Sequence, residues 1–274
     1  MPNEALYNEA FMQKHASAQE RHPELATSVL GGLYLHCYSL VTSAFLTERS
    51  VARLIDVAKE IEEMHDRTTS MVTDSIQLPQ HDEPQKIELA CAQSCTYCCH
   101  IRLTSTPLEV IGIAERLRTS GNAEPIIESL KKYEESVNGM PPEKRLFHLE
   151  ACPFLIEQLC SIYKIRPSAC RTYHSFDLNR CIMDFEDPKK MLGVPQNPVR
   201  LDIGSALFDA EEQACKELGL EHCVLEFVTG LRIALEDSSL VARWLSGEEC
   251  FAEAVNQSLN EYSEMLAEQM NPEN

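Results

Sequence analysis

Positive charge is scarce in this sequence: 24 lysines and arginines stand against 43 aspartates and glutamates, a net charge of −19. An acidic surface repels nucleic-acid phosphates and anionic lipid headgroups, so we expect neither nucleic acid nor a membrane as a partner. The shortage of positive charge is unevenly distributed along the sequence. Residues 1–90 carry 7 basic and 14 acidic side chains (net −7), residues 182–274 carry 6 and 19 (net −13), and residues 91–181 carry 11 and 10 (net +1). The middle third is therefore electrostatically distinct from both ends.

Several motifs of well-known chemistry are missing. The chain has no Walker A loop, no GxGxxG and no HExxH, so these motifs give no support for phosphate, dinucleotide or metalloprotease chemistry. Cys95-Thr-Tyr-Cys98 is followed by Cys99 instead of histidine, which excludes a c-type haem site. His148-Leu-Glu150 has the H-x-E of zinc deaminases, but their second motif, P-C-x-x-C, is absent.

The N-terminal residues also lack the basic region, apolar run and cleavage site of a secretory signal, and we expect a cytoplasmic protein. In that reducing compartment, clustered cysteines are more often metal ligands than disulfides. Residues 25–47 contain no formal charge, but they include His36, two glycines, three serines and three threonines. This composition favours a buried helix of a soluble protein over a membrane span, with Cys37 as a core residue.

Helical patterns occupy most of the chain. Apolar residues recur at helical spacing in residues 51–61, 207–218 and 251–266, and residues 224–235 are almost entirely apolar. Thr106-Pro107-Leu108-Glu109 is a capping box that predicts a helix through about Thr119, and a second helix is expected over residues 125–137. Residues 152–156 and 159–163 predict two short strands around Glu157-Gln158.

These patterns predict a mainly α fold. We expect helical bundle arms around a small cysteine-rich metal-binding core with at most a short β-hairpin. The predicted divisions are an N-terminal arm (residues 1–78), a cysteine-cluster domain (residues 79–194) and a C-terminal arm (residues 195–274). A polar linker is expected over residues 77–88, and the two arms are expected to pack as one unit.

Eight of the twelve cysteines lie between residues 91 and 181, in two groups of four. Cys98 and Cys99 are adjacent, so their Cα atoms are about 3.8 Å apart, closer than an ordinary disulfide allows. The spacing within the first group suits metal binding, whereas the wider second group needs a fold to gather it. Two converging groups are typical of two metal ions or of a polynuclear centre, and spacing does not separate zinc from iron. The predicted metal ligands are Cys91, Cys95, Cys98, Cys99, Cys152, Cys160, Cys170 and Cys181.

The motifs around these cysteines resemble a known family. Cys91-x₃-Cys95-x₂-Cys98-Cys99, followed by Cys152-Pro-Phe-Leu, Cys160-Ser-Ile-Tyr163 and Arg166-Pro167-x₂-Cys170-Arg171, is similar to the YkgJ-type cysteine-cluster family. That resemblance implies a zinc- or iron-chelating domain over about residues 91–181. The first gap here is x₃ where the family pattern has x₂, which makes Cys91 the least typical ligand.

Residues between the cysteines form a second set of candidates. Tyr163, Arg166, Arg171 and His174 are predicted to lie near the metal and to contact a cofactor or an anionic substrate, and the alternative for the arginines is support of the ligands. His100 and His174 are also candidate ligands, because imidazole readily completes a zinc or iron shell.

We therefore expect a cysteine-cluster protein that binds iron, an iron–sulfur cluster or zinc. An iron- or iron–sulfur-dependent oxidoreductase or protein-modifying enzyme, acting on a peptide or small molecule, is one reading. The alternatives are a zinc-stapled scaffold whose helical arms bind a protein or peptide partner, and a metal store or chaperone.

Overall fold

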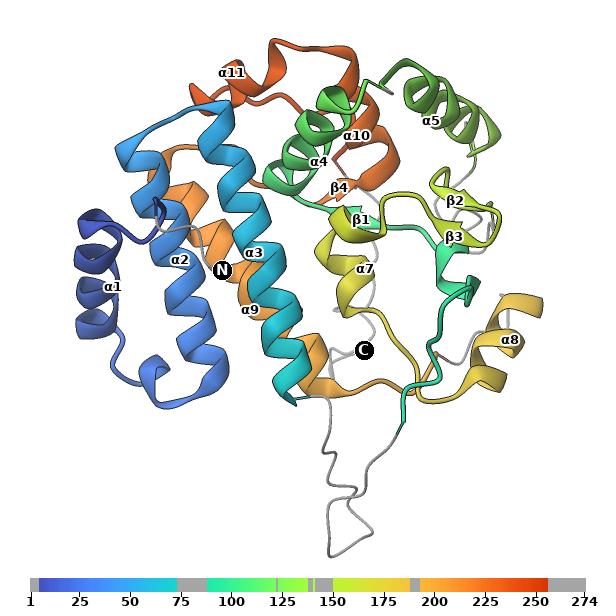
Figure 1. Ribbon diagram of the computed structural model, residues 1–274, viewed down its shortest axis with the longest axis horizontal. Coiled ribbons are helices and arrows are strands. Elements are labelled where there is room, and N and C mark those ends of the chain that lie inside the picture. Colours follow the sequence, from blue (N-terminus) through green and yellow to red (C-terminus); the bar gives the residue numbers. More distant parts are fainter. Residues whose placement is uncertain are drawn as a thin grey trace, which may run out of the picture.

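Most of the described chain is helical, and the predicted mainly α fold is confirmed (Figure 1). The computed structural model describes residues 5–72, 88–121, 123–137, 140, 150–187 and 193–255. The α-helices are α1 (Glu9–Arg21), α2 (Val29–Thr47), α3 (Val51–Val72), α4 (Pro107–Thr119), α5 (Ala123–Val137), α7 (Ser168–Thr172), α8 (Leu178–Glu186), α9 (Pro198–Leu218), α10 (Phe227–Glu236) and α11 (Leu240–Leu245). The short 3₁₀ helices are η1 (Leu25–Thr27), η2 (Tyr97–His100) and η3 (Tyr163–Ile165).

Helix α2 is the centre of a bundle formed with α1, α3 and α9, on one side of the molecule (Figure 1). It is long and apolar enough to cross a membrane, but 67% of its most apolar window is buried inside the protein. Its hydroxyl groups can be buried because they bond back to the helix: Ser39 donates to the Leu35 carbonyl at 2.6 Å and Thr42 to the Tyr38 carbonyl at 2.7 Å. The predicted core position of Cys37 is confirmed, since its side chain is fully buried.

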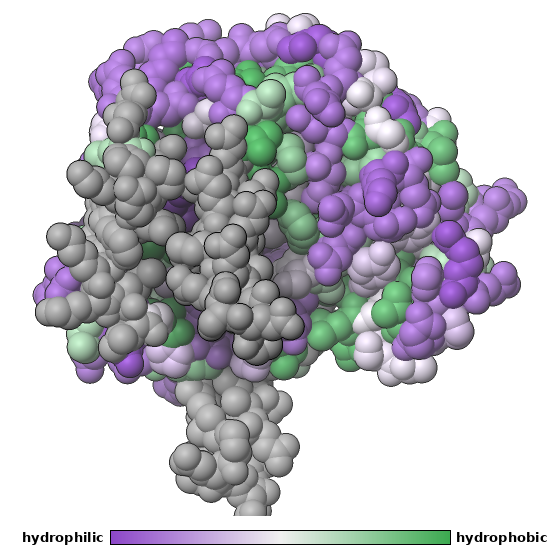
Figure 2. Space-filling model, turned by 180° about the vertical axis from the view of Figure 1, so that it is seen from behind, coloured by the Kyte–Doolittle hydropathy of each residue, from purple (hydrophilic) through white to green (hydrophobic). Residues whose placement is uncertain are grey.

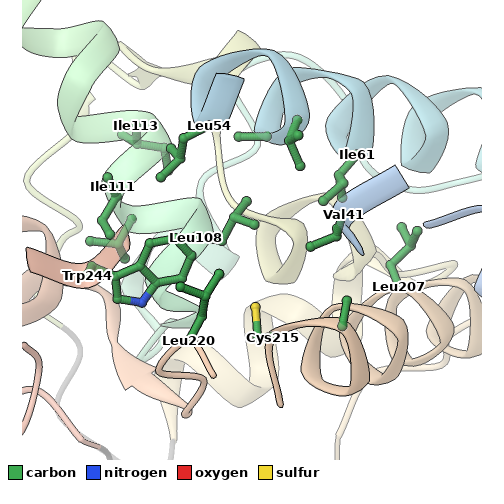
Figure 3. Close-up of a cluster of buried hydrophobic side chains, with 14 of the residues drawn as sticks. Val41, Leu54, Ile61, Leu108, Ile111, Ile113, Leu207, Cys215, Leu220 and Trp244 are labelled. Carbon is green, nitrogen blue, oxygen red and sulfur yellow. The ribbon is translucent and has the colours of Figure 1, made fainter. Parts of the chain in front are cut away.

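A second layer contains α4 and α10, with α5 packed on α10. The predicted capping box is present: the Thr106 hydroxyl accepts the Glu109 N–H, and the Glu109 carboxylate accepts the Thr106 N–H. Side chains of α2, α3, α4, α9 and α11 meet in one core, in which Trp244 is fully buried (Figure 3). Cys215 also points into this core (Figure 3).

Two small antiparallel sheets complete the fold. Strand β1 (Thr104–Ser105) pairs with β4 (Leu225–Glu226), and β2 (Leu155–Ile156) pairs with β3 (Leu159–Cys160). The second pair is the predicted hairpin. Its turn residues Glu157 and Gln158 have φ values of +49° and +63°, a left-handed conformation that is costly for residues other than glycine.

One expectation for the C-terminal third was wrong. Residues 225–226 form β4 instead of the start of a helix, because their backbone pairs with residues 104–105. Cys223 and Cys250 are half-buried and lie outside helices. Phe251 begins a turn, and most of the helix predicted over residues 251–266 lies outside the described residues. The linker predicted over residues 77–88 also lies outside them, apart from Glu88. The predicted division at residues 78/79 and 194/195 stays a prediction.

Hydrophilic residues dominate the upper part of the rear surface, and apolar residues are interspersed among polar ones below it (Figure 2). On the side of the molecule away from the bundle lie the β2–β3 hairpin and α8, with α7 between them and the bundle (Figure 1). This side carries the clustered cysteines.

Candidate metal centre

The first cysteine group lies on a turn that runs into η2. The Cys95 N–H donates to the Ala92 carbonyl at 3.0 Å, with Ser94 in a left-handed conformation, and the Cys99 N–H donates to the Thr96 carbonyl at 2.8 Å. These tight turns place three cysteines within five residues. The compact local geometry follows directly from the short spacing in the sequence.

The second group comes from four separate elements. Cys152 precedes the hairpin, Cys160 ends β3, Cys170 lies on α7 and Cys181 on α8. Backbone hydrogen bonds join this group to the first: the Cys152 N–H donates to the Cys99 carbonyl at 2.7 Å, and the Ala90 N–H donates to the Ser175 carbonyl at 2.9 Å. Helix α8 also packs on η2. The fold therefore brings together the two groups that are 53 residues apart at their nearest ends.

Cys91, Cys95 and Cys181 form one part of the centre. Desolvation in the fold raises the pKa of Cys91, and the thiols of Cys98, Cys95 and Cys181 raise it further. Desolvation likewise raises the pKa of Cys181, with added contributions from Cys95 and Cys98. These thiols are close enough to repel one another as thiolates, which is the arrangement that a cation relieves.

Cys152, Cys160 and Cys170 form the other part. Desolvation raises the pKa of Cys152 to about 11, and Cys160 and Cys98 contribute to the rise. The pKa of Cys170 is raised by desolvation and then by Cys152, Cys98 and Cys160. Cys98 also hydrogen-bonds to Cys99, which is the main cause of its own raised pKa. Cys98 thus interacts with both parts, and the adjacent pair Cys98–Cys99 stands where they meet.

Backbone N–H groups and one hydroxyl already point at several sulfurs. The Ser175 N–H donates to Cys91 Sγ at 3.4 Å, and the Ser175 hydroxyl hydrogen-bonds to Cys181 and lowers the pKa of that thiol. Backbone N–H groups of Phe154 and Ile162 act in the same way on Cys152 and Cys160. Such hydrogen bonds stabilise thiolates and tune metal–sulfur centres.

All twelve cysteines lie in the described part of the chain, and none is in a disulfide. Within the same residues, no three Cys, His, Asp or Glu side chains are arranged to hold one metal ion. The donor set is chemically suitable, because eight thiols are gathered with N–H donors already directed at their sulfurs. Binding would require the thiols to close further around the ion. The eight predicted ligands remain a prediction.

The two candidate arginines, Arg166 and Arg171, have different environments. Arg171 is buried and fully engaged: it donates to the carbonyls of Arg166 and Lys164 and pairs with Asp66 at 2.5 Å. Arg166 is half-buried, lies 3.8 Å over the Tyr163 ring, and lowers the pKa values of the Cys98, Cys160 and Cys170 thiols. Arg171 therefore supports the backbone of this segment, and Arg166 acts electrostatically on the thiols.

His174 is buried and uses both ring nitrogens inside the chain. Its Nδ1 is 2.7 Å from the Thr172 carbonyl, and its Nε2 accepts the Asn197 N–H at 2.6 Å. These bonds fix the chain that leads into α9. The ring of His100 contacts the edge of Phe185, at 4.9 Å between centroids. Metal ligation by either histidine stays a prediction.

Sequence reasoning did not identify three residues that shape this site. Ser175 bonds to two candidate ligands, and Arg200 interacts electrostatically with Cys91. Glu109 Oε1 accepts the Ser168 N–H at 2.7 Å, at the start of the helix that carries Cys170. Glu109 had a local signal in the capping box. For Ser175 and Arg200 the contacts join segments distant in sequence, and the sequence carries no signal for them.

The fold and the site define a mainly helical protein with a surface-accessible, cysteine-rich centre suited to metal ions. Residues 90–216 match the model of the CxxCxxCC family, which is described as a putative zinc- or iron-chelating domain. This segment contains all eight clustered cysteines and is similar to that family, which confirms the resemblance found in the sequence. Comparison with curated proteins and with solved structures gave no match.

Proposed function

We propose that the chain binds iron, as ions or as an iron–sulfur cluster, in a polynuclear centre held by the eight clustered cysteines, and uses it in a redox or protein-modifying reaction. The family match supports metal binding in general, to zinc or iron. The observation that carries the polynuclear assignment is the position of Cys98, which interacts with thiols of both parts of the centre. Eight thiols exceed what one tetrahedral ion needs, so two ions or a cluster accommodate them better.

The protein would contribute ligands, orientation and charge to such a centre. Arg166 and the N–H donors stabilise thiolates, which are the metal-binding form of cysteine. When bound, iron would supply one-electron chemistry at a position that remains partly open, because Cys91 and Cys98 are exposed. A cytoplasmic, reducing location, as expected from the sequence, would keep these thiols available.

A zinc-stapled scaffold is the second candidate. It is favoured by the shortage of buried apolar side chains around the cysteines: residues 88–104 contain no buried side chain. Such segments commonly depend on a structural metal. Its partner would be a protein or peptide on the helical arms.

Substitution of ligands tests the centre directly. Cys98→Ser and Cys170→Ser should each weaken metal binding by at least about tenfold and should lower Tm. A tenfold loss is a lower bound, because removing a residue that only hydrogen-bonds to a metal ligand can already cause it. Cys98→Ser should lose more metal than Cys181→Ser, because Cys98 interacts electrostatically with thiols of both parts. Elemental analysis of anaerobically purified protein gives the stoichiometry, and visible absorption separates an iron–sulfur cluster from colourless zinc.

Cys250→Ser is the matched control, since Cys250 is half-buried in a loop and is not among the thiols that interact with the centre. It should retain the full metal content. Equal metal content in Cys98→Ser, Cys170→Ser and the unsubstituted protein would refute the ligand assignment. Zinc alone, bound tightly and at fixed stoichiometry, would favour the scaffold.

A further inference from the structure

A cleft of about 520 Å³ opens beside the cysteine centre, and its lining is strongly cationic. Lys164, Arg166, Arg171 and Arg200 line it, and Asp66 is the one carboxylate among the described lining residues. The formal charge of this lining is thus +3, in a chain whose net charge is −19. Clefts lined by one sign of charge concentrate ligands of the opposite sign.

Three of these four cations have no acidic partner within the described ranges. Arg171 is neutralised by Asp66 at 2.5 Å and by Glu62 at 3.4 Å. Across the described residues, Lys164, Arg166 and Arg200 form no ion pair. Arg171 therefore belongs to the framework of the cleft, while the other three cations carry uncompensated charge.

One N–H donor of Arg200 has no hydrogen-bond acceptor among the described residues. Its Nη2 donates to the Arg171 carbonyl at 3.1 Å, but its Nε is buried and has no hydrogen-bond partner in the described part of the protein. A buried unsatisfied donor is costly, and charged groups pay more than neutral ones. Arg166 is held in place by the Tyr163 ring and by the Tyr163 carbonyl, to which it donates at 3.0 Å. The two arginines are thus positioned before any ligand arrives.

We propose that this cleft binds a dianionic oxyanion, the phosphate group of a small phosphomonoester, between Lys164, Arg166 and Arg200. Guanidinium groups match phosphate oxygens in pairs, and lysine adds a mobile point charge. The hydroxyl-bearing residues Thr69 and Ser70 also line the cleft. The site is assembled from α3, residues 163–171 and the start of α9, which explains why no phosphate-binding motif marks it in the sequence. It does not require the metal centre to be loaded.

The competing role for these cations is to balance the charge of the thiolates. Arg166 lowers the pKa values of three cysteine thiols, and Arg200 interacts with Cys91, so substitution of either arginine changes the thiols as well. Lys164 is exposed and is not among the main causes of the pKa shift of any clustered cysteine given above. Lys164→Gln therefore separates the two roles.

Calorimetric titration of the purified full chain with inorganic phosphate, at low ionic strength, tests the proposal. We expect saturable binding that Lys164→Gln and Arg200→Gln each weaken by about tenfold, the effect of losing one charged hydrogen bond. Lys216→Gln is the matched control: it removes the same charge from α9, about 24 Å along the helix from Arg200, and should change affinity less than twofold. Metal content is measured on each sample, so loss of metal is recognised independently of loss of phosphate.

Three results would overturn the proposal. They are the absence of saturable phosphate binding, an unchanged affinity in Lys164→Gln, and an equal loss in Lys216→Gln, which would indicate general electrostatic attraction. Malonate titrated in parallel distinguishes the ligand class, since tighter binding of this dicarboxylate than of phosphate would contradict the phosphate assignment.

Discussion

Glu211 places a carboxyl group in the interior of the protein, on α9. Its side chain is almost completely buried, and burial raises its pKa to about 8, with a further contribution from Glu109. His222 Nε2 lies 3.6 Å from Glu211 Oε1, and burial lowers the pKa of His222 to about 4. Between these two pH values both side chains are uncharged. The pair is therefore compatible with the core at neutral pH.

This arrangement gives the protein a specific pH dependence. The pKa of Glu211 rises from 4.5 to about 8 on folding, so its stabilising contribution is complete below pH 4.5 and is lost as pH increases through 8. The Glu211→Gln variant stays neutral and avoids this loss. Between pH 5 and 8 its free energy of unfolding, relative to the unsubstituted protein, should increase by up to about 1.4 kcal/mol per pH unit. Urea denaturation at pH 6, 7.5 and 9 measures this; a difference that is independent of pH would contradict it.

At the scale of elements, α7 and α9 approach closely at Gly204. A Cβ atom added there would lie 2.5 Å from Thr172 Oγ1, closer than any real contact. Helix α7 also carries Cys170, so the distance between the two helices helps to set the position of a candidate ligand. Gly204 therefore influences the position of Cys170 through the packing of α7 on α9.

Gly204→Ala should force α7 away from α9. We expect a destabilisation of about 1–3 kcal/mol, typical of overpacking, accompanied by weaker metal binding. The double variant Gly204→Ala/Thr172→Ala should recover part of the loss, because it removes the clashing hydroxyl. Gly32→Ala on α2, where an added Cβ meets nothing within 4 Å, is the control and should be neutral or stabilising. Thermal denaturation and elemental analysis on these variants and on Thr172→Ala alone decide the question. Additive effects of the Gly204 and Thr172 substitutions would show that Thr172 is not the obstacle.

Elements with a local cause were predictable from the sequence. The α4 capping box and the β2–β3 hairpin depend on residues within a few positions of each other, and both are present. The assignment of residues 225–226 to a helix failed because pairing with β1, over 120 residues away, decides their conformation. The same limit applies to the site: spacing pointed to the cysteines, whereas Ser175 and Arg200 acquire their roles from contacts between distant segments.

At the scale of the whole molecule, apolar burial and the cysteines occupy different regions. The buried core is contributed mainly by α2, α3, α4, α9 and α10. Residues 88–104 contain no buried side chain, and the buried residues of segment 163–187 are Pro167 and the polar Arg171, His174 and Ser175. Hydrophobic burial therefore stabilises the helical layers far more than the segments that carry most of the candidate ligands.

Metal removal should consequently loosen one region and leave the other folded. In the chelated protein, we expect amide hydrogen exchange to accelerate by at least about tenfold across residues 88–104 and 163–187, because bound metal supplies the cross-links that apolar contacts do not. Exchange in the interior of α2 and α9 should remain slow, since their mutual packing does not involve the cysteine centre. The measurement compares the same peptides before and after chelation. Equal acceleration throughout the chain would show that metal and core form one cooperative unit, and no acceleration at the cysteines would show that these segments are held without metal.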